Sequence, residues 1–214
     1  MAKKDRQRAI GTGKPQAKRF LVVVEGAVTE PEYIEAVKRS RVMKSIQVLI
    51  ETGHTDPIGI VNRAKEIRMK ASKTEPFDQV WCVFDAEVKL TQQARFGLNT
   101  ALDAAARSGI CIAVSNPCFE IWLLWHTADH AAWIASDAVQ RLCVERGVTV
   151  IEGGKHIQNV SALVENGYQA AKVRACNLDQ AHDRNGTEKP EDRNPSSGVY
   201  KLIDAIYEAF PSRN

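Results

Sequence analysis

Carboxylates stand where two apolar segments of this chain end. Glu25 follows residues 20–24, and Asp85 and Glu87 follow residues 80–84. Uninterrupted apolar runs of this length, rich in Val, are typical of strands buried on both faces of a parallel sheet. An acid at the end of such a strand lies at the edge where open α/β folds bind ligands. Three carboxylates gathered there repel one another unless a divalent cation joins them, which indicates metal-assisted phosphoryl chemistry.

Local geometry supports both groups of acids, although each also has a structural interpretation. Gly26 lets the chain turn after the first strand and leaves Glu25 at the sheet edge. Asp85 and Glu87 are two residues apart, so in an extended segment their side chains point the same way and suit Mg²⁺. Alternatively, Glu25 only favours the dipole of the following helix, and the other two are solvated loop acids.

Residues 115–122 hold the densest group of candidate residues. Pro117 at a helix start, with Asn116 before it, predicts a capped helix from residue 118 to about residue 126. Glu120 falls in its first turn, where it is either a further metal ligand or an acid that complements the helix dipole. One face of this helix is predicted to pack in the core rather than to stack on nucleic-acid bases; it holds Phe119, Trp122, Leu123 and His126.

Other chemistries have little support in the sequence. The five cysteines form no C-x-x-C pair, so we predict buried, inert thiols rather than a disulfide framework or a zinc knuckle. His126 and His130 are four residues apart, but the Glu of an H-E-x-x-H motif is missing, which argues against zinc. A G-x-S-x-G nucleophile elbow is also absent.

Strands and helices alternate through the first 127 or so residues. This alternation implies right-handed crossovers and a parallel sheet covered by helices on both faces. We therefore predict an α/β fold in which a four-stranded parallel sheet lies between helices. The strands are expected at residues 20–24, 46–50, 80–84 and 110–114, and the helices at 29–39, from Pro57, at 91–107 and at 118–126.

Beyond that point the pattern is helical only. Helices are expected near residues 131–145, 157–176 and 197–210, with a polar stretch at 179–197 between the last two. The expected organisation is a basic arm at 1–19, an α/β core at 20–127 and a helical extension at 128–214.

Charge is distributed unevenly along the chain. Seven basic residues and one acid give residues 1–19 a net charge of +6, which leaves −3 for the rest of the 214 residues. A basic arm of this kind suits the phosphate backbone of a nucleic acid, although a solvated tail has the same composition. The candidate phosphate contacts are Lys14, Lys18, Arg19 and, if it is more than part of a turn, Lys155.

Composition is that of an ordinary globular protein, with 44% hydrophobic and 26% charged residues. No apolar stretch approaches the roughly 20 residues that span a bilayer. The N-terminus lacks the apolar core of a signal peptide, so a cytoplasmic location is expected, with no membrane partner.

Several of these segments, in this order, resemble the RloB-like protein family. They are residues 24–26, Thr29-Glu30 with Tyr33, residues 84–87, and residues 115–124 with His126. Residues 194–203 also resemble the ending of that family, so the likeness covers about residues 20–205. The block at residues 116–122, Asn-Pro followed by Phe, Glu and Trp, is its most specific part.

The resemblance implies a fold and a set of roles. RloB-like proteins belong to the wider Toprim group, whose fold is a four-stranded parallel sheet between helices and whose members include topoisomerases, primases and nucleases. By this likeness Glu25 would be the acid that assists proton transfer, and Asp85 and Glu87 the metal-binding pair, with Glu87 where Asp is usual. The family is associated with abortive infection and anti-phage defence, often beside a partner ATPase called RloA.

The leading hypothesis is a Mg²⁺- or Mn²⁺-dependent nuclease that acts on RNA or DNA in phage defence. Asp85 and Glu87, with Glu120, would hold the cation, and Glu25 would orient or deprotonate the attacking water. The alternative is a non-catalytic sensor or adaptor that binds nucleotide or nucleic acid, or docks on the ATPase. A primase-like polymerase would need further domains. The sequence leaves the oligomeric state open, a homo-oligomer included.

Overall fold

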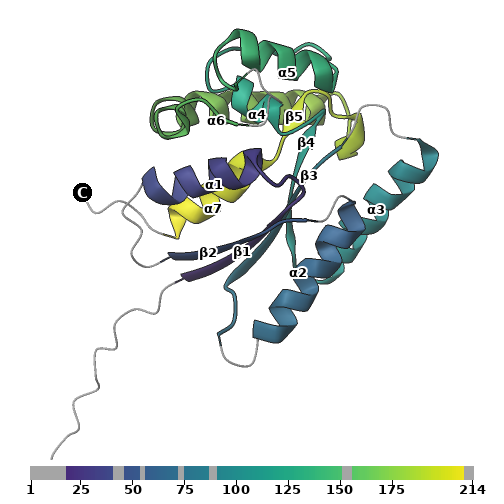
Figure 1. Cartoon of the computed structure of the whole chain (residues 1–214). Helices are drawn as coiled ribbons and strands as arrows, with labels where there is room; N and C mark the ends of the chain where they lie inside the picture. The colour runs from purple at the N-terminus through teal and green to yellow at the C-terminus, as the bar shows by residue number, and fades with distance from the viewer. Residues whose placement is uncertain are drawn as a thin grey trace, which may run out of the picture.

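The computed structural model describes residues 18–40, 46–53, 56–71, 75–86, 91–150 and 156–209. In this part of the chain, one sheet has the strand order β2-β1-β3-β4-β5 (Figure 1). The strands are β1 (Lys18–Val24), β2 (Ile46–Glu51), β3 (Gln79–Asp85), β4 (Cys111–Asn116) and β5 (Ser196–Ser197).

Strands β2, β1, β3 and β4 are parallel to their neighbours, as the alternation of strand and helix predicts. The predicted fold class, an α/β fold with a mainly parallel sheet between helices, is therefore confirmed. Strand β5 is an addition, and it pairs antiparallel to β4 through Ser197 opposite Ser115. A two-residue strand has no hydrophobic periodicity, so the sequence does not reveal it.

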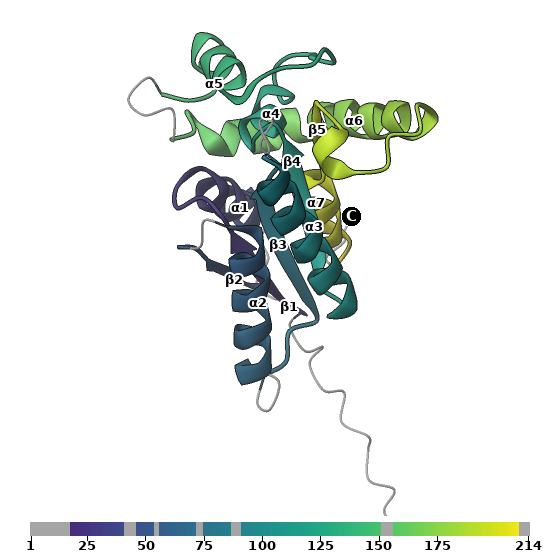
Figure 2. The same cartoon turned by 90° about the vertical axis from the view of Figure 1, so that its right-hand side faces the viewer.

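Helices cover both faces of the sheet. Figure 1 shows α2 and α3 against one face and α1 and α7 against the other, and Figure 2 shows α5 and α6 beyond the end of β4. The helices are α1 (Thr29–Ser40), α2 (Pro57–Ala71), α3 (Gln92–Arg107), α4 (Glu120–Leu124), α5 (Ser136–Glu145), α6 (Val160–Arg184) and α7 (Val199–Glu208), with a short 3-10 helix η1 (Pro190–Asp192).

Three helix boundaries differ from those predicted. Helix α4 begins only at Glu120, because β4 continues to Asn116, and it ends at Leu124. The Asn116 amide donates to the carbonyl oxygens of Pro190 and Glu191, at 3.0 Å each, and does not cap a helix. Helix α5 begins later than expected, at Ser136, and α6 continues to Arg184, through the first part of the predicted polar stretch.

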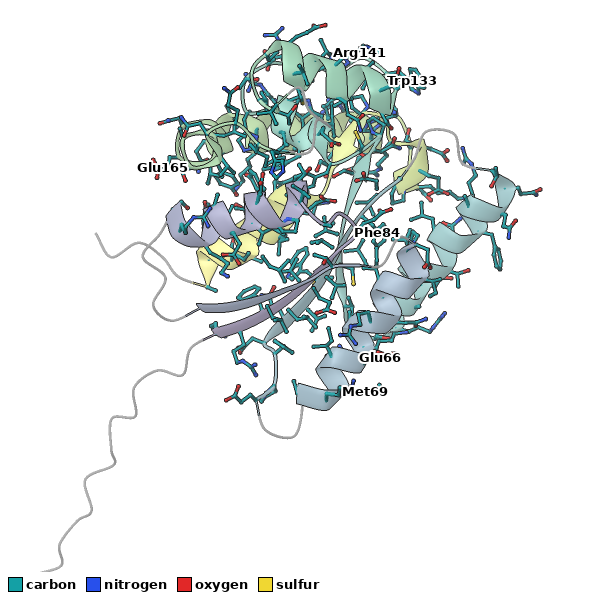
Figure 3. The ribbon with its side chains drawn as sticks, viewed as in Figure 1. Glu66, Met69, Phe84, Trp133, Arg141 and Glu165 are labelled. Carbon is teal, nitrogen blue, oxygen red and sulfur yellow. The ribbon has the colours of Figure 1, made fainter. Side chains whose placement is uncertain are left out.

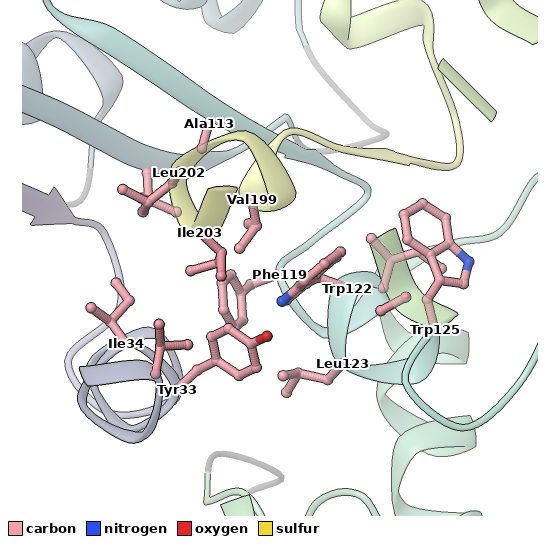
Figure 4. Packing of buried hydrophobic residues seen from close by; sticks show 14 of the residues in the cluster. Tyr33, Ile34, Ala113, Phe119, Trp122, Leu123, Trp125, Val199, Leu202 and Ile203 are labelled. Carbon is pink, nitrogen blue, oxygen red and sulfur yellow. The ribbon is translucent and has the colours of Figure 1, made fainter. Parts of the chain in front are cut away.

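Side chains of the central strands alternate between two cores. In β1, Phe20 and Val22 face the core under α1 and α7, whereas Leu21 and Val23 face the core under α2 and α3. The first core is rich in aromatic rings, and Tyr33 meets Phe119 and Trp122 edge to face at centroid distances of 5.9 and 6.1 Å (Figure 4). The predicted apolar face of α4 is thus part of the core.

His126 is a buried neutral residue of the same core. Its Nδ1–H donates to the Trp122 carbonyl oxygen and its Nε2 accepts from the Tyr33 hydroxyl, both at 2.9 Å, in the tautomer that satisfies both contacts. Burial lowers the pKa of His126 to about 4. Gly167 of α6 packs directly on this ring: a Cβ there would lie 2.7 Å from the His126 Cβ.

The described helices include none that combines the length and the apolar character needed to cross a membrane.

Candidate functional site

Three predicted acids lie at the carboxyl edge of the sheet. Glu25 directly follows β1, Asp85 is the last residue of β3, and Glu120 comes shortly after β4 at the start of α4. Because these strands are parallel neighbours, their carboxyl ends meet at one edge. The Glu25 N–H still donates to the Val83 carbonyl oxygen at 3.1 Å, so β1–β3 pairing continues into the site.

Glu25 and Asp85 are in direct contact. The Glu25 Oε2 accepts a hydrogen bond from the Asp85 backbone N–H at 3.1 Å, although the two residues are 60 positions apart in the chain. Both residues are half-buried. The backbone of one candidate residue therefore fixes the carboxylate of the other.

These acids border a cavity of about 270 Å³ at the sheet edge. One wall is formed by the turn from β1 into α1, a second by the segment from β4 into α4, and a third by α5. Ser136 and Gln140 contribute uncharged hydrogen-bonding groups from the α5 side. No Lys, Arg or His belongs to the described lining, whereas four carboxylates do: Glu25, Glu30, Asp85 and Glu120.

Glu30 is the site residue that the sequence reasoning missed. It lies in the first turn of α1, is only 7% exposed, and its Oε1 accepts from the Gly26 N–H at 3.0 Å. Its carboxylate occupies the space where a side chain at position 26 would be, since a Cβ on Gly26 would lie 2.0 Å from the Glu30 Oε2. The spacing of Gly26 and Glu30 was the only feature of the sequence that could have indicated this contact. An acid in the first turn of a helix is, however, usually explained by its favourable interaction with the helix dipole.

The crowding of acids raises two pKa values. Burial raises the pKa of Asp85 well above its usual value, and the negative charges of Glu30, Glu120 and Glu25 add to the effect against a backbone hydrogen bond from Phe119. Burial also raises the pKa of Glu30, again with contributions from Glu120 and Glu25. The negative charges of Glu25 and Glu120 therefore make ionisation of Asp85 and Glu30 harder, and a positive charge in the cavity would relieve the repulsion.

The thiols at the cavity are unsuited to nucleophilic chemistry. Cys118 lines the cavity, and burial, together with the charges of Glu120 and Asp85, raises its pKa. Burial raises the pKa of Cys143 to about 12, and its Sγ contacts the Glu120 carbonyl oxygen at 3.4 Å. Thiolates are the reactive species, so neither residue is a candidate nucleophile. Cys111 is exposed and Cys176 is half-buried, so the prediction of buried thiols is wrong for these two residues.

The carboxylate oxygens at the cavity could ligate a divalent cation, but they do not form a complete set of ligands around one. Within the described ranges, no three His, Cys, Asp or Glu side chains already form a metal-ligand set. Mg²⁺ keeps several waters and is usually bound through only one or two carboxylates, so oxygen donors spread around a cavity fit this ion chemically. The third predicted acid, Glu87, lies outside the described residues.

Two of the four basic residues predicted to contact phosphate, Lys18 and Arg19, are not at this edge. Lys14 and Lys155 lie outside the described residues. Lys18 and Arg19 begin β1, whereas Glu25 follows its end, a separation of about 23 Å along an extended strand. There Lys18 pairs with Asp78 at 3.6 Å, and Arg19 pairs with Glu75 at 3.4 Å. Both are therefore engaged at the amino edge of the sheet.

The two Asn-Pro segments of the chain meet behind the site. The Asn194 amide donates to the Asn116 Oδ1 at 3.1 Å, and both Asn-Pro peptide bonds are cis. Asn194 also binds the backbone of Ile134 twice, as acceptor from its N–H and donor to its carbonyl oxygen, both at 2.9 Å. This network joins the end of β4, the segment before β5 and the segment before α5.

The family model described as RloB-like protein matches residues 20–206, which is most of the chain. No curated protein matches the sequence.

Proposed function

The chain belongs to the RloB-like protein family, and on that premise we propose that it is a Mg²⁺- or Mn²⁺-dependent nuclease acting in bacterial phage defence. Its reaction would be hydrolysis of a phosphodiester bond in RNA or DNA, carried out in the cytoplasm. The observation that carries the proposal is the cavity at the carboxyl edge of the sheet, where Glu25, Asp85, Glu120 and Glu30 gather without a basic residue in the described lining.

Asp85 and Glu120 would hold the cation, with Glu87 as a further ligand from outside the described residues. When bound, the cation supplies the charge that clamps the scissile phosphate and offsets the negative charge of the transition state. A nucleic-acid phosphate would otherwise be repelled from four carboxylates. Glu30 adds to the negative potential that favours cation binding, and after burial its charge is the next largest cause of the raised pKa of Asp85.

Glu25 would act on the attacking water. Its carboxylate is oriented by the Asp85 N–H at 3.1 Å, and a general base must be held in this way to accept a proton in a defined direction. Ser136 and Gln140 face the acids across the cavity and would hydrogen-bond the phosphate or sugar from the α5 side.

The second candidate function is a non-catalytic sensor or adaptor that docks on a partner ATPase of the RloA type. Two observations favour it: the described residues do not form a closed three-ligand metal site, and residues beyond 19 carry a net charge of −3. An acidic body grips long nucleic acid poorly. A nuclease should bind nucleic acid with steep salt dependence, whereas an adaptor should bind little at any salt concentration.

The test uses the purified full-length protein with labelled single- and double-stranded RNA and DNA, in Mg²⁺, in Mn²⁺ and in EDTA. We expect cleavage with a cation only, and a loss of at least 100-fold in kcat for Glu25→Gln and for Asp85→Asn, because each removes a charge from the cavity. Glu145→Gln, which changes an exposed acid at the end of α5, is the control and should cleave normally. Cleavage at the wild-type rate by both cavity variants would exclude the assignment.

A further inference from the structure

Trp133 is an exposed indole beside an otherwise well-covered core. Its side chain is 64% exposed, whereas Trp81, Trp122 and Trp125 are 7% exposed or less. An indole in water forgoes the large gain that burial of an aromatic ring brings. Figure 3 labels Trp133 at the α5 end of the molecule, next to the label of Arg141.

The backbone around Trp133 is held firmly. The next residue, Ile134, is 6% exposed, and its N–H and carbonyl oxygen are both bound by the Asn194 amide at 2.9 Å. Earlier in the same segment, the Trp125 Nε1–H donates to the His130 carbonyl oxygen at 2.9 Å, and Arg174 pairs with Asp129. The backbone that carries the exposed ring is therefore held in place by these hydrogen bonds. A ligand that contacts the ring does not have to order this loop, so binding costs less conformational entropy.

This hydrogen-bonded support of the ring adjoins the lining of the cavity at two points. Asn194 is bonded to Asn116, which precedes the cavity residue Pro117. On the other side, Trp133 lies three residues before Ser136, another lining residue, so their Cα atoms are at most about 11 Å apart. A strand with its scissile phosphate at the carboxylates has a neighbouring nucleotide within reach of the indole.

We propose that Trp133 is a stacking platform for an unpaired base of the substrate, and that the substrate is therefore a single-stranded or looped nucleic acid. The proposal rests on the proposed function for the identity of the ligand. An indole on a protein surface stacks only on a base whose face is exposed, and bases within a duplex are covered by their neighbours. Stacking tolerates any base, so Trp133 favours unpaired structure rather than a sequence.

Its surroundings favour a nucleic acid over a protein partner. A stable protein interface needs about 800 Å² on each side. The other large apolar side chains that the structure shows exposed come from separate parts of the chain and not from the segment of Trp133; they are Leu49, Met69, Phe96, Val150 and Val173. The α5 side instead offers Ser136 and Gln140 in the cavity, and the exposed Arg141, which pairs with Asp137 at 2.7 Å.

The experiment measures binding and cleavage separately. In a Glu25→Gln background with Mg²⁺, affinity for a single-stranded oligonucleotide and for a blunt duplex of the same sequence is titrated by tryptophan fluorescence and by electrophoretic mobility. Trp133→Ala should weaken single-strand binding about 5- to 150-fold, the range for one base–aromatic stack, and leave duplex binding unchanged. Trp133→Phe, which keeps a ring, should restore most of the affinity.

Met69→Ala is the matched control. Met69 is also 64% exposed, and Figure 3 places it at the opposite end of the molecule, on α2. Its substitution should change neither affinity. In the wild-type background, cleavage of single strands should show a raised KM in Trp133→Ala with little change in kcat.

Each other result has a defined meaning. The inference is overturned if Trp133→Ala binds single strands within twofold of its parent, or if it loses affinity for the duplex to the same extent. The proposed function still stands in either case if the wild-type protein cleaves normally. A changed oligomeric state in Trp133→Ala also overturns it, because the indole is then part of a protein interface. Loss of single-strand binding in a protein that never cleaves supports the platform and refutes the nuclease.

Discussion

Asp85 is a residue of the site whose carboxyl group lowers the stability of the folded protein. Its carboxyl group is half-buried at the end of β3, and burial and three neighbouring acids raise its pKa well above the usual value. Below the pKa of the unfolded chain, both states hold the proton and stability is unaffected. As the pH rises from there to the folded-state pKa, the unfolded state ionises more easily, so folding becomes less favourable. At neutral pH without a cation, the Asp85 carboxyl group therefore destabilises the protein.

Asp85→Asn should consequently stabilise the metal-free protein while it abolishes the proposed activity. In EDTA near pH 7.5 we expect the variant to unfold at a higher temperature, by about 2–4 °C for each 1 kcal/mol of repulsion removed. Added Mg²⁺ should raise the unfolding temperature of the wild type, since a cation that binds only the folded state stabilises it, and should raise that of the variant much less. Scanning fluorimetry with and without the cation measures both effects.

Asp103→Asn is the control for this prediction, because Asp103 is exposed on α3. It should have the wild-type unfolding temperature in EDTA and the wild-type response to Mg²⁺. An Asp85→Asn protein that is less stable than the wild type in EDTA would show that the carboxylate is a structural hydrogen-bonding group and not a site of repulsion.

The residues of the site were predictable to different degrees. Glu25 and Asp85 were identified because they follow apolar runs, and parallel strands bring their ends to one edge. Glu30 was not, because its place in the cavity depends on the turn at Gly26, through which its carboxylate folds back to the Gly26 N–H at 3.0 Å. That contact is a three-dimensional one, and no periodicity encodes it.

Among the elements, α4 shows where local patterns fail. The apolar spacing of residues 118–126 suits a longer helix, but the observed helix has only five residues because β4 extends to Asn116. The Asn116 side chain is engaged by η1 and by Asn194, residues more than 70 positions away. Caps predicted from sequence assume local partners, and this asparagine has distant ones.

The packing of α6 on the residues after α4 depends on one glycine. At Gly167 a Cβ would lie 2.7 Å from the His126 Cβ and 3.1 Å from the His126 carbonyl oxygen. We expect Gly167→Ala to lower the free energy of unfolding by about 1–3 kcal/mol, the usual cost of overpacking a core, because a backbone atom is among those that must move. Urea denaturation followed by circular dichroism measures the change.

Gly97→Ala is the opposite case in the same protein. Gly97 lies inside α3 and has no atom within 4 Å of the position of a Cβ. Alanine there should stabilise the protein by about 0.5–1 kcal/mol through helix propensity alone. If Gly167→Ala proved as harmless as Gly97→Ala, the close approach of α6 to His126 would be incorrect.

At the scale of the whole molecule, distant segments complete one core. Leu202 and Ile203 of α7, near the end of the chain, belong to the same buried cluster as Phe20 and Val22 of β1. Figure 4 shows the two α7 residues in this cluster with Tyr33 and Phe119. The alternation of strand and helix predicts the sheet but carries no information on which face receives α7. Strand β5 brings the chain back beside β4 at Ser115, directly before α7 begins at Val199.

Charge is the other property of the whole molecule, and it divides the chain between a basic arm and an acidic remainder. Changing five basic residues of the arm to Gln lowers the net charge from +3 to −2; they are Lys3, Lys4, Arg6, Arg8 and Lys14. If the arm follows the substrate backbone, single-strand affinity at low salt should fall. The slope of log K against log salt should also become shallower, by about 0.7 for each phosphate that the arm no longer neutralises.

A second variant separates the position of these charges from their number. It changes five exposed basic residues of the body to Gln and reaches the same net charge; they are Arg39, Lys70, Arg107, Arg184 and Lys189. We expect it to keep the wild-type salt slope, and both variants to keep the wild-type unfolding temperature. Equal slopes in the two variants would mean that overall charge alone attracts the nucleic acid. A wild-type slope in the arm variant would mean that the arm is only a solvated tail, and that the substrate is held at the carboxyl edge of the sheet.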